Sequence, residues 1–411
     1  MKYSFKRSDP LTLGIELELQ IIHPVTRDLI SAADQLLAAA ASHPSADRIK
    51  PEITKAMIEL NSEVHGSAPE LLTEVKALRD VLINAADLVN VGIAGGGCHP
   101  FMSWKDRDIF DAPRFHYLSE TYGYLAQQFT VFGQHIHIGV EKGDEAIAIS
   151  QKLAPYVPHF VALAASSPFF EGVDTQFMCG RLNALNAFPL SGSLPPDIHG
   201  WKDFEQHLEQ LQQSGLIESI KDLYWDIRPK PEFGTVELRV CDTPLSVDRA
   251  CQLAAFAQAL VAWLHSQPIP GQLAPLCYRT NRFQAARYGL GGYYVDERQG
   301  KERLYEHLLR TLDQVQPFAE SLGSAALLEP LYEQARRRQG DADWMRERHA
   351  ELNSLPEVVT ACMQVFRGES PSTEVEPLAP STPRRIRALS EPIIGRNASL
   401  AVPPAYKNVL H

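Results

Sequence analysis

Four segments of the chain alternate apolar and polar side chains, which is the pattern of a half-buried strand. The first runs from Leu11 to Ile22, and the others cover residues 57–64, 134–140 and 235–240. In each segment the apolar side chains share one face and the polar ones share the other. The polar faces carry Glu16 and Glu18; Glu59, Asn61 and Glu63; His135 and His137; and Thr235, Glu237 and Arg239. The pattern predicts a sheet with one apolar face and one face rich in Glu and His.

Apolar residues at helical spacing separate or follow these strands. They predict helices over residues 31–42, 69–91, 114–129, 144–165 and 248–265, and mainly helix over 301–366, interrupted at Gly340 and Pro356. Helix 248–265 suits either the core or the interface of a homodimer, and the pattern leaves both open. Residues 369–411 hold seven prolines and predict an extended tail. We therefore expect one domain over residues 1–368, followed by this Pro-rich tail.

Composition narrows the class of protein. The 411 residues are 45% hydrophobic and 22% charged, which is typical of a globular chain, and the net charge is −11 without a long basic run. Nucleic acid is therefore an unfavourable partner. No apolar stretch is long enough to cross a bilayer and the N-terminus lacks an apolar signal core, so we expect a cytoplasmic protein without a membrane partner. The six cysteines contain no C-x-x-C pair and predict free thiols.

The polar strand faces carry the candidate chemistry. Two carboxylates at positions i and i+2 of a strand, as at Glu16 and Glu18, repel each other unless a cation or a basic group lies between them. One such pair fits a metal site and a solvated edge equally well, but four faces of this kind favour a site. Oxygen-rich ligands suit Mg²⁺ or Mn²⁺, which usually serve phosphates. No phosphate-binding glycine loop is present, so Arg181, Arg228 and Arg239 are the candidate phosphate contacts.

The motifs that carry this chemistry resemble those of the type 2 glutamate–cysteine ligases, which are carboxylate–amine ligases related to glutamine synthetase. The resemblance covers most of residues 10–295. It rests on G-I-E-L-E (14–18), P-E-I-T-K-A-M-I-E-L (51–60), G-C-H-P-F (97–101), G-Q-H-I-H-I-G (133–139), C-G-R-L-N (179–183), W-D-I-R-P-K-P-E-F-G-T-V-E-L-R (225–239) and N-R-F-Q-A-A-R-Y-G (281–289). Each motif is short, but their order and spacing together are specific.

The resemblance implies an α+β, glutamine synthetase-like fold, in which a curved antiparallel sheet carries helices on its outer face and binds ATP, glutamate and divalent metal ions on its concave face. It also implies roles for single residues. The implied metal ligands are Glu16, Glu18, Glu52, Glu59, His135 and Glu237. Arg228 and Arg239 are the implied contacts to ATP and the acyl phosphate, and with Glu237 they form the implied catalytic set. His137, Arg181, Asn281 and Arg287 are the implied substrate-binding residues.

Because a carboxylate is a poor electrophile, such a ligase transfers the γ-phosphoryl group of ATP to it, and an amine then displaces phosphate. The expected substrates are glutamate and cysteine or another amine. Segments 171–200 and 277–300 are candidates to close over the site. Two alternatives remain: a cupin-like metal site of His135, His137 and Glu141, and a relative that binds nucleotide without turnover.

Overall fold

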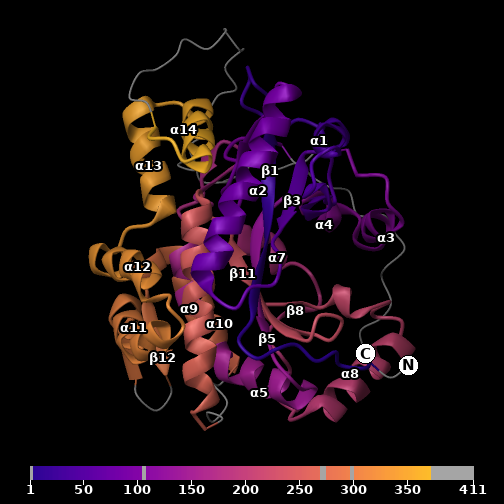
Figure 1. Ribbon diagram of the computed structural model, residues 1–411, viewed down its shortest axis with the longest axis vertical. Coiled ribbons are helices and arrows are strands. Elements are labelled where there is room, and N and C mark those ends of the chain that lie inside the picture. Colours follow the sequence, from indigo (N-terminus) through magenta and orange to yellow (C-terminus); the bar gives the residue numbers. More distant parts are fainter. Residues whose placement is uncertain (1–2, 104–107, 269–274, 297–299, 372–411) are drawn as a thin grey trace, which may run out of the picture. The chain divides into compact units, whose positions relative to one another are not determined.

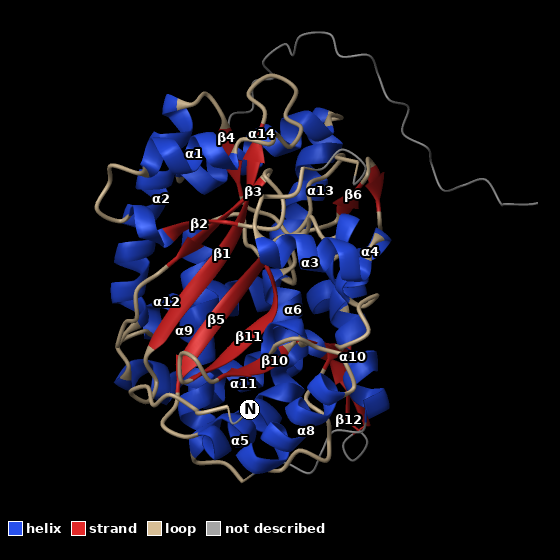
Figure 2. Cartoon of the chain, turned by 90° about the vertical axis from the view of Figure 1, so that its right-hand side faces the viewer, coloured by secondary structure: helices blue, strands red, loops and turns tan. Residues whose placement is uncertain are grey.

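The computed structural model describes residues 3–103, 108–268, 275–296 and 300–371. Its centre is a seven-stranded antiparallel sheet in the order β10-β11-β5-β1-β3-β2, with β4 paired to the end of β1. Figure 2 shows these strands side by side. Their bounds are β1 (Leu13–Ile22), β2 (Ile49–Pro51), β3 (Met57–Asn61), β4 (Gly92–Ala94), β5 (Gly133–Gly139), β10 (Ile227–Lys230) and β11 (Thr235–Asp242).

Helices make up most of the remaining described chain, as Figure 1 shows. They are α1 (Ala33–Ala40), α2 (Ala68–Leu88), α3 (Pro113–Tyr122), α4 (Tyr124–Gln127), α5 (Gly143–Leu153), α6 (Val157–Ala164), α7 (Arg181–Leu185), α8 (Trp201–Gln213), α9 (Val247–His265), α10 (Pro275–Tyr288), α11 (Leu304–Ser321), α12 (Ala325–Arg337), α13 (Asp341–Leu352) and α14 (Leu355–Arg367). Three small two-stranded sheets pair β6 (Phe169–Phe170) with β7 (Val173–Asp174), β8 (Ser191–Gly192) with β9 (Tyr224–Trp225), and β12 (Tyr293–Asp296) with β13 (Gly300–Arg303).

The apolar face of the main sheet packs on helices. Helix α9 contacts β1 and β5, α2 contacts β1, and α5 and α6 contact β11. Side chains such as Leu17, Ile136 and Leu238 are buried in the resulting core. This burial removes apolar surface from water and leaves the opposite face of each strand for polar side chains. The predicted α+β fold, an antiparallel sheet with helices on its outer face, is confirmed.

Helix α9 packs in the core, which decides between the two positions that its apolar sequence allowed. Most of its side chains are buried within this chain, and the Ser246 hydroxyl caps its first turn by accepting a hydrogen bond from the Arg249 N–H. Helices α11 and α12 pack against it. Within the described part of the chain, no helix is long and apolar enough to cross a membrane.

Several predicted elements are shorter or broken. Strand β3 ends at Asn61, so Glu63 lies beyond it and pairs with Arg48. The helix expected over 144–165 divides into α5 and α6 around a single 3₁₀ turn, where prolines remove backbone donors. The helix expected over 114–129 breaks at Gly123, whose φ is +50°. The helices over 301–366 do break near Gly340 and Pro356. Residues 372–411, which hold most of the predicted tail, lie outside the described residues.

Candidate active site

The polar face of the main sheet gathers two groups of metal-ligating side chains. Strand pairing sets Glu16 opposite His135, Glu18 opposite Glu59, and Glu237 opposite His137. One group contains Glu16, His137 and Glu237, and the other contains Glu18, Glu52 and Glu59. Within each group the candidate ligand atoms lie within 4.8 Å of one another. The neighbouring positions of Glu16 and Glu18 on β1 place the two groups side by side.

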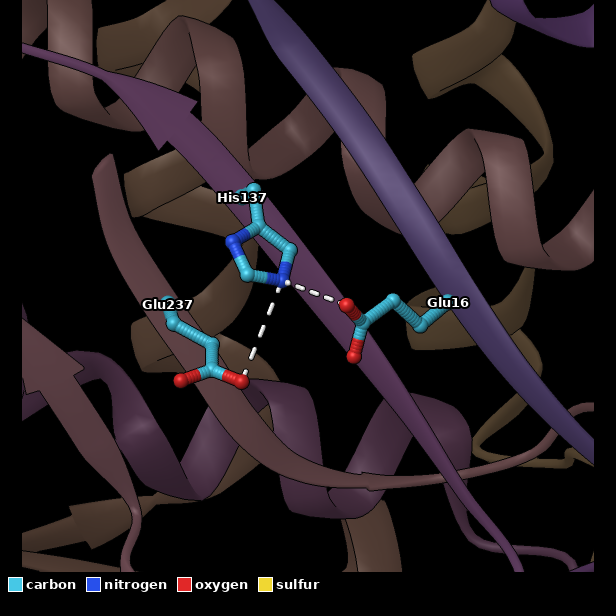
Figure 3. Close-up of side chains that lie close together, drawn as sticks. All are labelled: Glu16, His137 and Glu237. Atoms are coloured by element: carbon cyan, nitrogen blue, oxygen red, sulfur yellow. Dashed lines mark ion pairs between the residues drawn. The ribbon is translucent and has the colours of Figure 1, made fainter. Parts of the chain in front are cut away.

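The first group comes from three adjacent strands, and Figure 3 shows its side chains pointing toward one another. His137 Nε2 lies 3.5 Å from Glu16 Oε1 and 3.8 Å from Glu237 Oε1. This nitrogen is buried and has no hydrogen-bond partner. The other ring nitrogen, Nδ1, lies 3.0 Å from the Thr235 hydroxyl, which orients the ring. An orphaned imidazole nitrogen facing two carboxylates fits a divalent cation.

The second group consists of carboxylates alone. Burial and the charge of Glu18 raise the pKa of Glu52 to about 7. Burial, Glu16 and Glu52 raise the pKa of Glu59 well above its ordinary value. Glu52 comes directly after β2 and accepts a hydrogen bond from the Ile53 N–H, while Glu59 accepts one from Asn61. Because the repulsion between these groups would be relieved by a cation, the donor set fits a hard ion such as Mg²⁺ or Mn²⁺.

His135 lies between the two groups. Its Nδ1 is 2.9 Å from Glu16 Oε2, and its Nε2 is 3.8 Å from Glu18 Oε1. Burial and the nearby Arg239 lower the pKa of His135. Although burial opposes it, the hydrogen bond to His135 and the charge of the nearby His137 imidazole lower the pKa of Glu16 well below its ordinary value. The resemblance implied that His135 is the ligand and His137 binds substrate. Both imidazoles face carboxylates of the first group, since His135 Nδ1 also lies 3.8 Å from Glu237 Oε1, and both roles stay predictions.

The two predicted phosphate-binding arginines have different surroundings. Arg228 is buried opposite Glu237 on β10, where Nε and Nη2 donate to both of its carboxylate oxygens, and Nη1 donates to backbone carbonyls. Arg239 donates through Nη1 to Glu237 Oε1 at 2.5 Å and is partly exposed. Although burial opposes it, the charges of Arg228, Arg239 and Lys230 lower the pKa of Glu237 well below its ordinary value. Arg228 therefore holds Glu237, and Arg239 is the better placed to meet a ligand.

A cavity of about 40 Å³ opens beside these residues. Its lining includes Glu18, His135, Arg181, Asp226 and Arg239. Arg181 is almost fully buried, and its side chain donates weakly to the Val240 and Arg239 carbonyls, while its Nε has no partner. A β-bulge in β11 between Leu238 and Cys241 falls at Arg239, and bulges of this kind re-aim a side chain next to a site. The bulge thus helps to bring Arg239 to this cavity.

The structure separates the remaining predicted residues from the metal-ligand groups. The Asn281 amide bonds the backbone N–H and C=O of Val295 and so joins α10 to β12. Arg287 is partly exposed and donates hydrogen bonds to the Gln176 backbone and side-chain oxygens. Both side chains therefore have structural partners. Glu141 pairs with Arg7 at 2.5 Å and does not join His135 and His137, so the cupin-like site is not assembled.

Two residues that the sequence argument did not single out belong to this region. Lys230 follows Arg228 by two positions on β10, and burial lowers its pKa although Glu237 opposes that effect. The same alternation that marked the other strands would have placed it beside Arg228. Asp226 accepts hydrogen bonds from Tyr278 and Arg282, and its carbonyl accepts one from the Arg239 N–H. No local signal could indicate that arrangement, since its partners lie on α10.

Comparison with known proteins identifies the family. The model of glutamate–cysteine ligase family 2 matches residues 12–369. The chain belongs to glutamate–cysteine ligase family 2. A family relative from Bordetella avium strain 197N, named "Putative glutamate--cysteine ligase 2", is 57% identical over 389 residues, covering 95% of this chain and 96% of that protein. A relative of the same name from Janthinobacterium strain Marseille is 46% identical over 358 residues, covering 86% and 96%.

Solved structures agree on the fold. The glutamate–cysteine ligase of Francisella tularensis, crystallised in complex with AMP, matches with a TM-score of 0.64 at 14% identity and covers 88% of this chain and 90% of that one. A bifunctional glutathione synthetase from Pasteurella multocida matches with a TM-score of 0.60 at 13% identity, covering 87% and 51%. The resemblance inferred from the motifs is confirmed, and the family assignment makes this chain a ligase.

Proposed function

We propose that this family 2 ligase joins the γ-carboxylate of glutamate to the amine of cysteine or another small amine, using ATP and two divalent cations. The observation that carries the proposal is the pair of metal-ligand groups set side by side on one sheet face, with arginines next to Glu237. The names of the relatives supply the two amino acids as first candidates. The family is one of ATP-dependent carboxylate–amine ligases, and ATP is therefore the expected phosphoryl donor.

The reaction explains these residue types. A carboxylate is a poor electrophile, so one of its oxygens attacks the γ-phosphorus of ATP and ADP leaves, which gives an acyl phosphate. The amine then attacks the acyl carbon, loses a proton, and expels phosphate as the amide bond forms. Such chemistry needs charge stabilisation and exclusion of water more than a protein nucleophile. The glutamates, histidines and arginines of the sheet face supply charge of both signs, and the proposed reaction needs no nucleophile from the protein.

Each polar residue then has a distinct task. Glu16, His137 and Glu237 would hold one cation, and Glu18, Glu52 and Glu59 would hold another. Bound Mg²⁺ or Mn²⁺ would neutralise negative charge on the phosphates. Arg228 and Lys230 keep Glu237 ionised, and Arg239 reaches into the small cavity, where it can stabilise the oxygens of the transferred phosphoryl group.

A trapping experiment tests this function without requiring the natural amine. Purified protein is incubated with Mg²⁺, ATP, glutamate and hydroxylamine, a small nucleophile that is uncharged near neutral pH, and both ADP and the glutamyl hydroxamate are measured. Cysteine and a panel of amines then replace hydroxylamine. We expect ADP release that depends on glutamate together with hydroxamate formation. Absence of both with every carboxylate and amine tried would refute the ligase proposal, and nucleotide binding without ADP release would support a non-catalytic relative.

A matched pair of variants links the activity to the sheet face. Glu237→Gln removes a charge from the first ligand group, whereas Glu232→Gln makes the same change at an exposed position on the same hairpin. We expect Glu237→Gln to abolish hydroxamate formation and Glu232→Gln to retain it. Equal activity of the two variants would remove Glu237 from the proposed site.

A further inference from the structure

A lysine without a charged partner lies at one end of the polar sheet face. Lys230 is the last residue of β10, and only 8% of its surface is exposed. Among the residues that the structure describes, neither a carboxylate nor a hydrogen-bond acceptor is paired with its ammonium. Charged side chains that are buried to this degree are normally paired, because removing a charge from water is costly. The position of Lys230 therefore points to an anionic ligand.

The residues around Lys230 place its ammonium beside the first ligand group. Lys230 lies opposite Thr235 on β11, and the Thr235 hydroxyl meets the His137 ring. The Lys230 Nζ lies 5.4 Å from the centroid of the Phe233 ring, a distance typical of a cation–π contact, and that ring lies 5.8 Å from the His137 ring. Because Phe233 is about half exposed, this end of the face is open to a ligand.

The carboxylate that most attracts Lys230 is already bound by two other cations. Glu237 Oε2 accepts a hydrogen bond from Arg228, and Glu237 Oε1 accepts from both Arg228 and Arg239. Glu237 therefore attracts the Lys230 ammonium from a distance without pairing with it. An ammonium is a compact point charge that binds phosphate oxygens well. The charge of Lys230 thus remains for a ligand, and a phosphate group suits it.

The first ligand group separates Lys230 from Arg239. Along β11 the polar face presents Thr235, Glu237 and Arg239 in this order, and strand pairing sets Lys230 beside Thr235. The small cavity lies at the Arg239 end, where the buried Nε of Arg181 has no partner. A guanidinium of this kind suits the carboxylate that receives the phosphoryl group. The two ends of the face are therefore suited to different parts of the reaction.

We infer that Lys230 is a catalytic residue whose ammonium contacts the β-phosphate of ATP and stabilises ADP as it leaves. The inference rests on the proposed function, because it requires the γ-phosphoryl group to lie between the small cavity and Lys230. In phosphoryl transfer the attacking and leaving oxygens lie roughly in line, on opposite sides of phosphorus. An attack from the Arg239 end therefore directs the leaving oxygen toward the Lys230 end.

The step needs the charge of Lys230 and no proton from it. An oxygen of the substrate carboxylate forms a bond to the γ-phosphorus, and the bond from this phosphorus to the bridging oxygen breaks. The electron pair of the broken bond stays on that oxygen, which becomes a terminal oxygen of the ADP β-phosphate. A fixed ammonium beside it stabilises negative charge that grows in the transition state, without having to reorganise.

A comparison of ADP with AMP tests the contact, because only ADP carries a β-phosphate. Calorimetric titration with saturating Mg²⁺ gives the affinity of each nucleotide for the wild type, Lys230→Met and Lys230→Arg. Methionine is nearly as long as lysine and lacks the charge. We expect Lys230→Met to weaken ADP binding about tenfold or more, as for the loss of a charge-assisted hydrogen bond, and to change AMP binding less than about twofold. Lys230→Arg should keep the preference of the wild type for ADP.

Turnover and thermal unfolding complete the design. Lys230→Met should lower the kcat for hydroxamate formation about tenfold or more, while the KM for glutamate stays unchanged. Lys202→Met makes the same substitution at an exposed position on α8, and should match the wild type in both binding and turnover. The Tm of Lys230→Met should not fall below that of the wild type, because the substitution removes a buried charge that has no partner.

The binding results decide the inference separately from the ligase function. Wild-type affinities of Lys230→Met for both nucleotides, equal losses for ADP and AMP, or equal binding of the two by the wild type would overturn the contact. Hydroxamate formation by the wild type in that case would leave the ligase function intact. A wild type that releases no ADP and forms no hydroxamate would count against the function itself, whereas a loss of ADP preference in Lys230→Met would still support the phosphate contact.

Discussion

Replacing Glu52 with glutamine should stabilise the metal-free protein while it abolishes activity. Burial and the charge of Glu18 raise the Glu52 pKa to about 7 in the folded state, compared with an ordinary value of 4.5. The folded state therefore binds more protons than the unfolded state between these values, so stability falls as pH rises from about 4.5 to about 7. At about 1.4 kcal/mol for each pKa unit, the penalty above pH 7 is about 3 kcal/mol. Glutamine is neutral and of similar size, and its side-chain oxygen can still accept from the Ile53 N–H.

The magnitude is large enough for thermal unfolding to detect. With an unfolding entropy of roughly 2 cal/mol/K for each residue, 3 kcal/mol corresponds to a rise in Tm of about 4 °C for a domain of this size. We expect this gain for Glu52→Gln at pH 8 in EDTA and little gain at pH 4.5, where Glu52 is protonated in the wild type. Addition of Mg²⁺ or Mn²⁺ should raise the Tm of the wild type more than that of the variant.

The matched control is Glu120→Gln, which makes the same change at an exposed position on α3. It should leave the Tm within about 1 °C at both pH values, as is usual for surface substitutions. A Glu52→Gln protein that is less stable than the wild type at pH 8 in EDTA would refute the reasoning, because it would show that Glu52 is not under electrostatic strain. Full activity of the variant would separately remove Glu52 from the metal site.

Three further outcomes follow from other parts of the structure. Glu237→Gln should lower the unfolding free energy by roughly 3–5 kcal/mol, because it leaves Arg228 and Arg239 without their buried counter-charge. Denaturant unfolding measures this difference, and a change below about 1 kcal/mol would contradict the prediction. Burial lowers the pKa of His307 to about 4 and that of its hydrogen-bonded partner His159 well below 6.5. The unfolding free energy should therefore be fully retained above pH 6.5 and fall as the pH is lowered through 4, with a loss of about 3 kcal/mol for His307. An unaltered pH slope in His307→Asn would contradict that assignment. Gly133→Ala should reduce turnover at least tenfold, because its Cβ would overlap the Arg181 guanidinium; wild-type kinetics would show that the position of Arg181 is unimportant.

The alternation along the strands predicted the residues of the candidate site more completely than helical spacing predicted the bounds of the helices. Alternation alone placed Glu16, Glu18, Glu59 and Glu237 on polar faces, because side chains on a strand point to opposite faces in turn. It could not give the pairing, in which Glu18 lies opposite Glu59, since strand partners are chosen by the whole sheet. Nor could it separate His135 from His137, which share a face. Only the packed strands show that His137 Nε2 meets two carboxylates and lacks a hydrogen bond.

Residues outside the sheet were harder to place, for a physical reason. Asn281 and Arg287 lie in one motif on α10, and nothing local indicates that Asn281 bonds the Val295 backbone or that Arg287 bonds Gln176. Side-chain roles of this kind depend on distant segments that share no periodic pattern. The same limit applies to Asp226, whose partners Tyr278 and Arg282 follow it by more than fifty residues.

The strand order also has a consequence for how this protein is made. Strand β1 leaves the ribosome early, but its central neighbour β5 begins only at Gly133, and β11 begins at Thr235. Glu16 therefore lacks His137 and Glu237 until these distant strands arrive, and contacts so far apart in sequence form slowly. A cation cannot find three ligands of the first group before β11 has paired. Metal binding by the first group is thus expected to follow completion of the sheet, whereas Glu18, Glu52 and Glu59 of the second group all come from the first 61 residues.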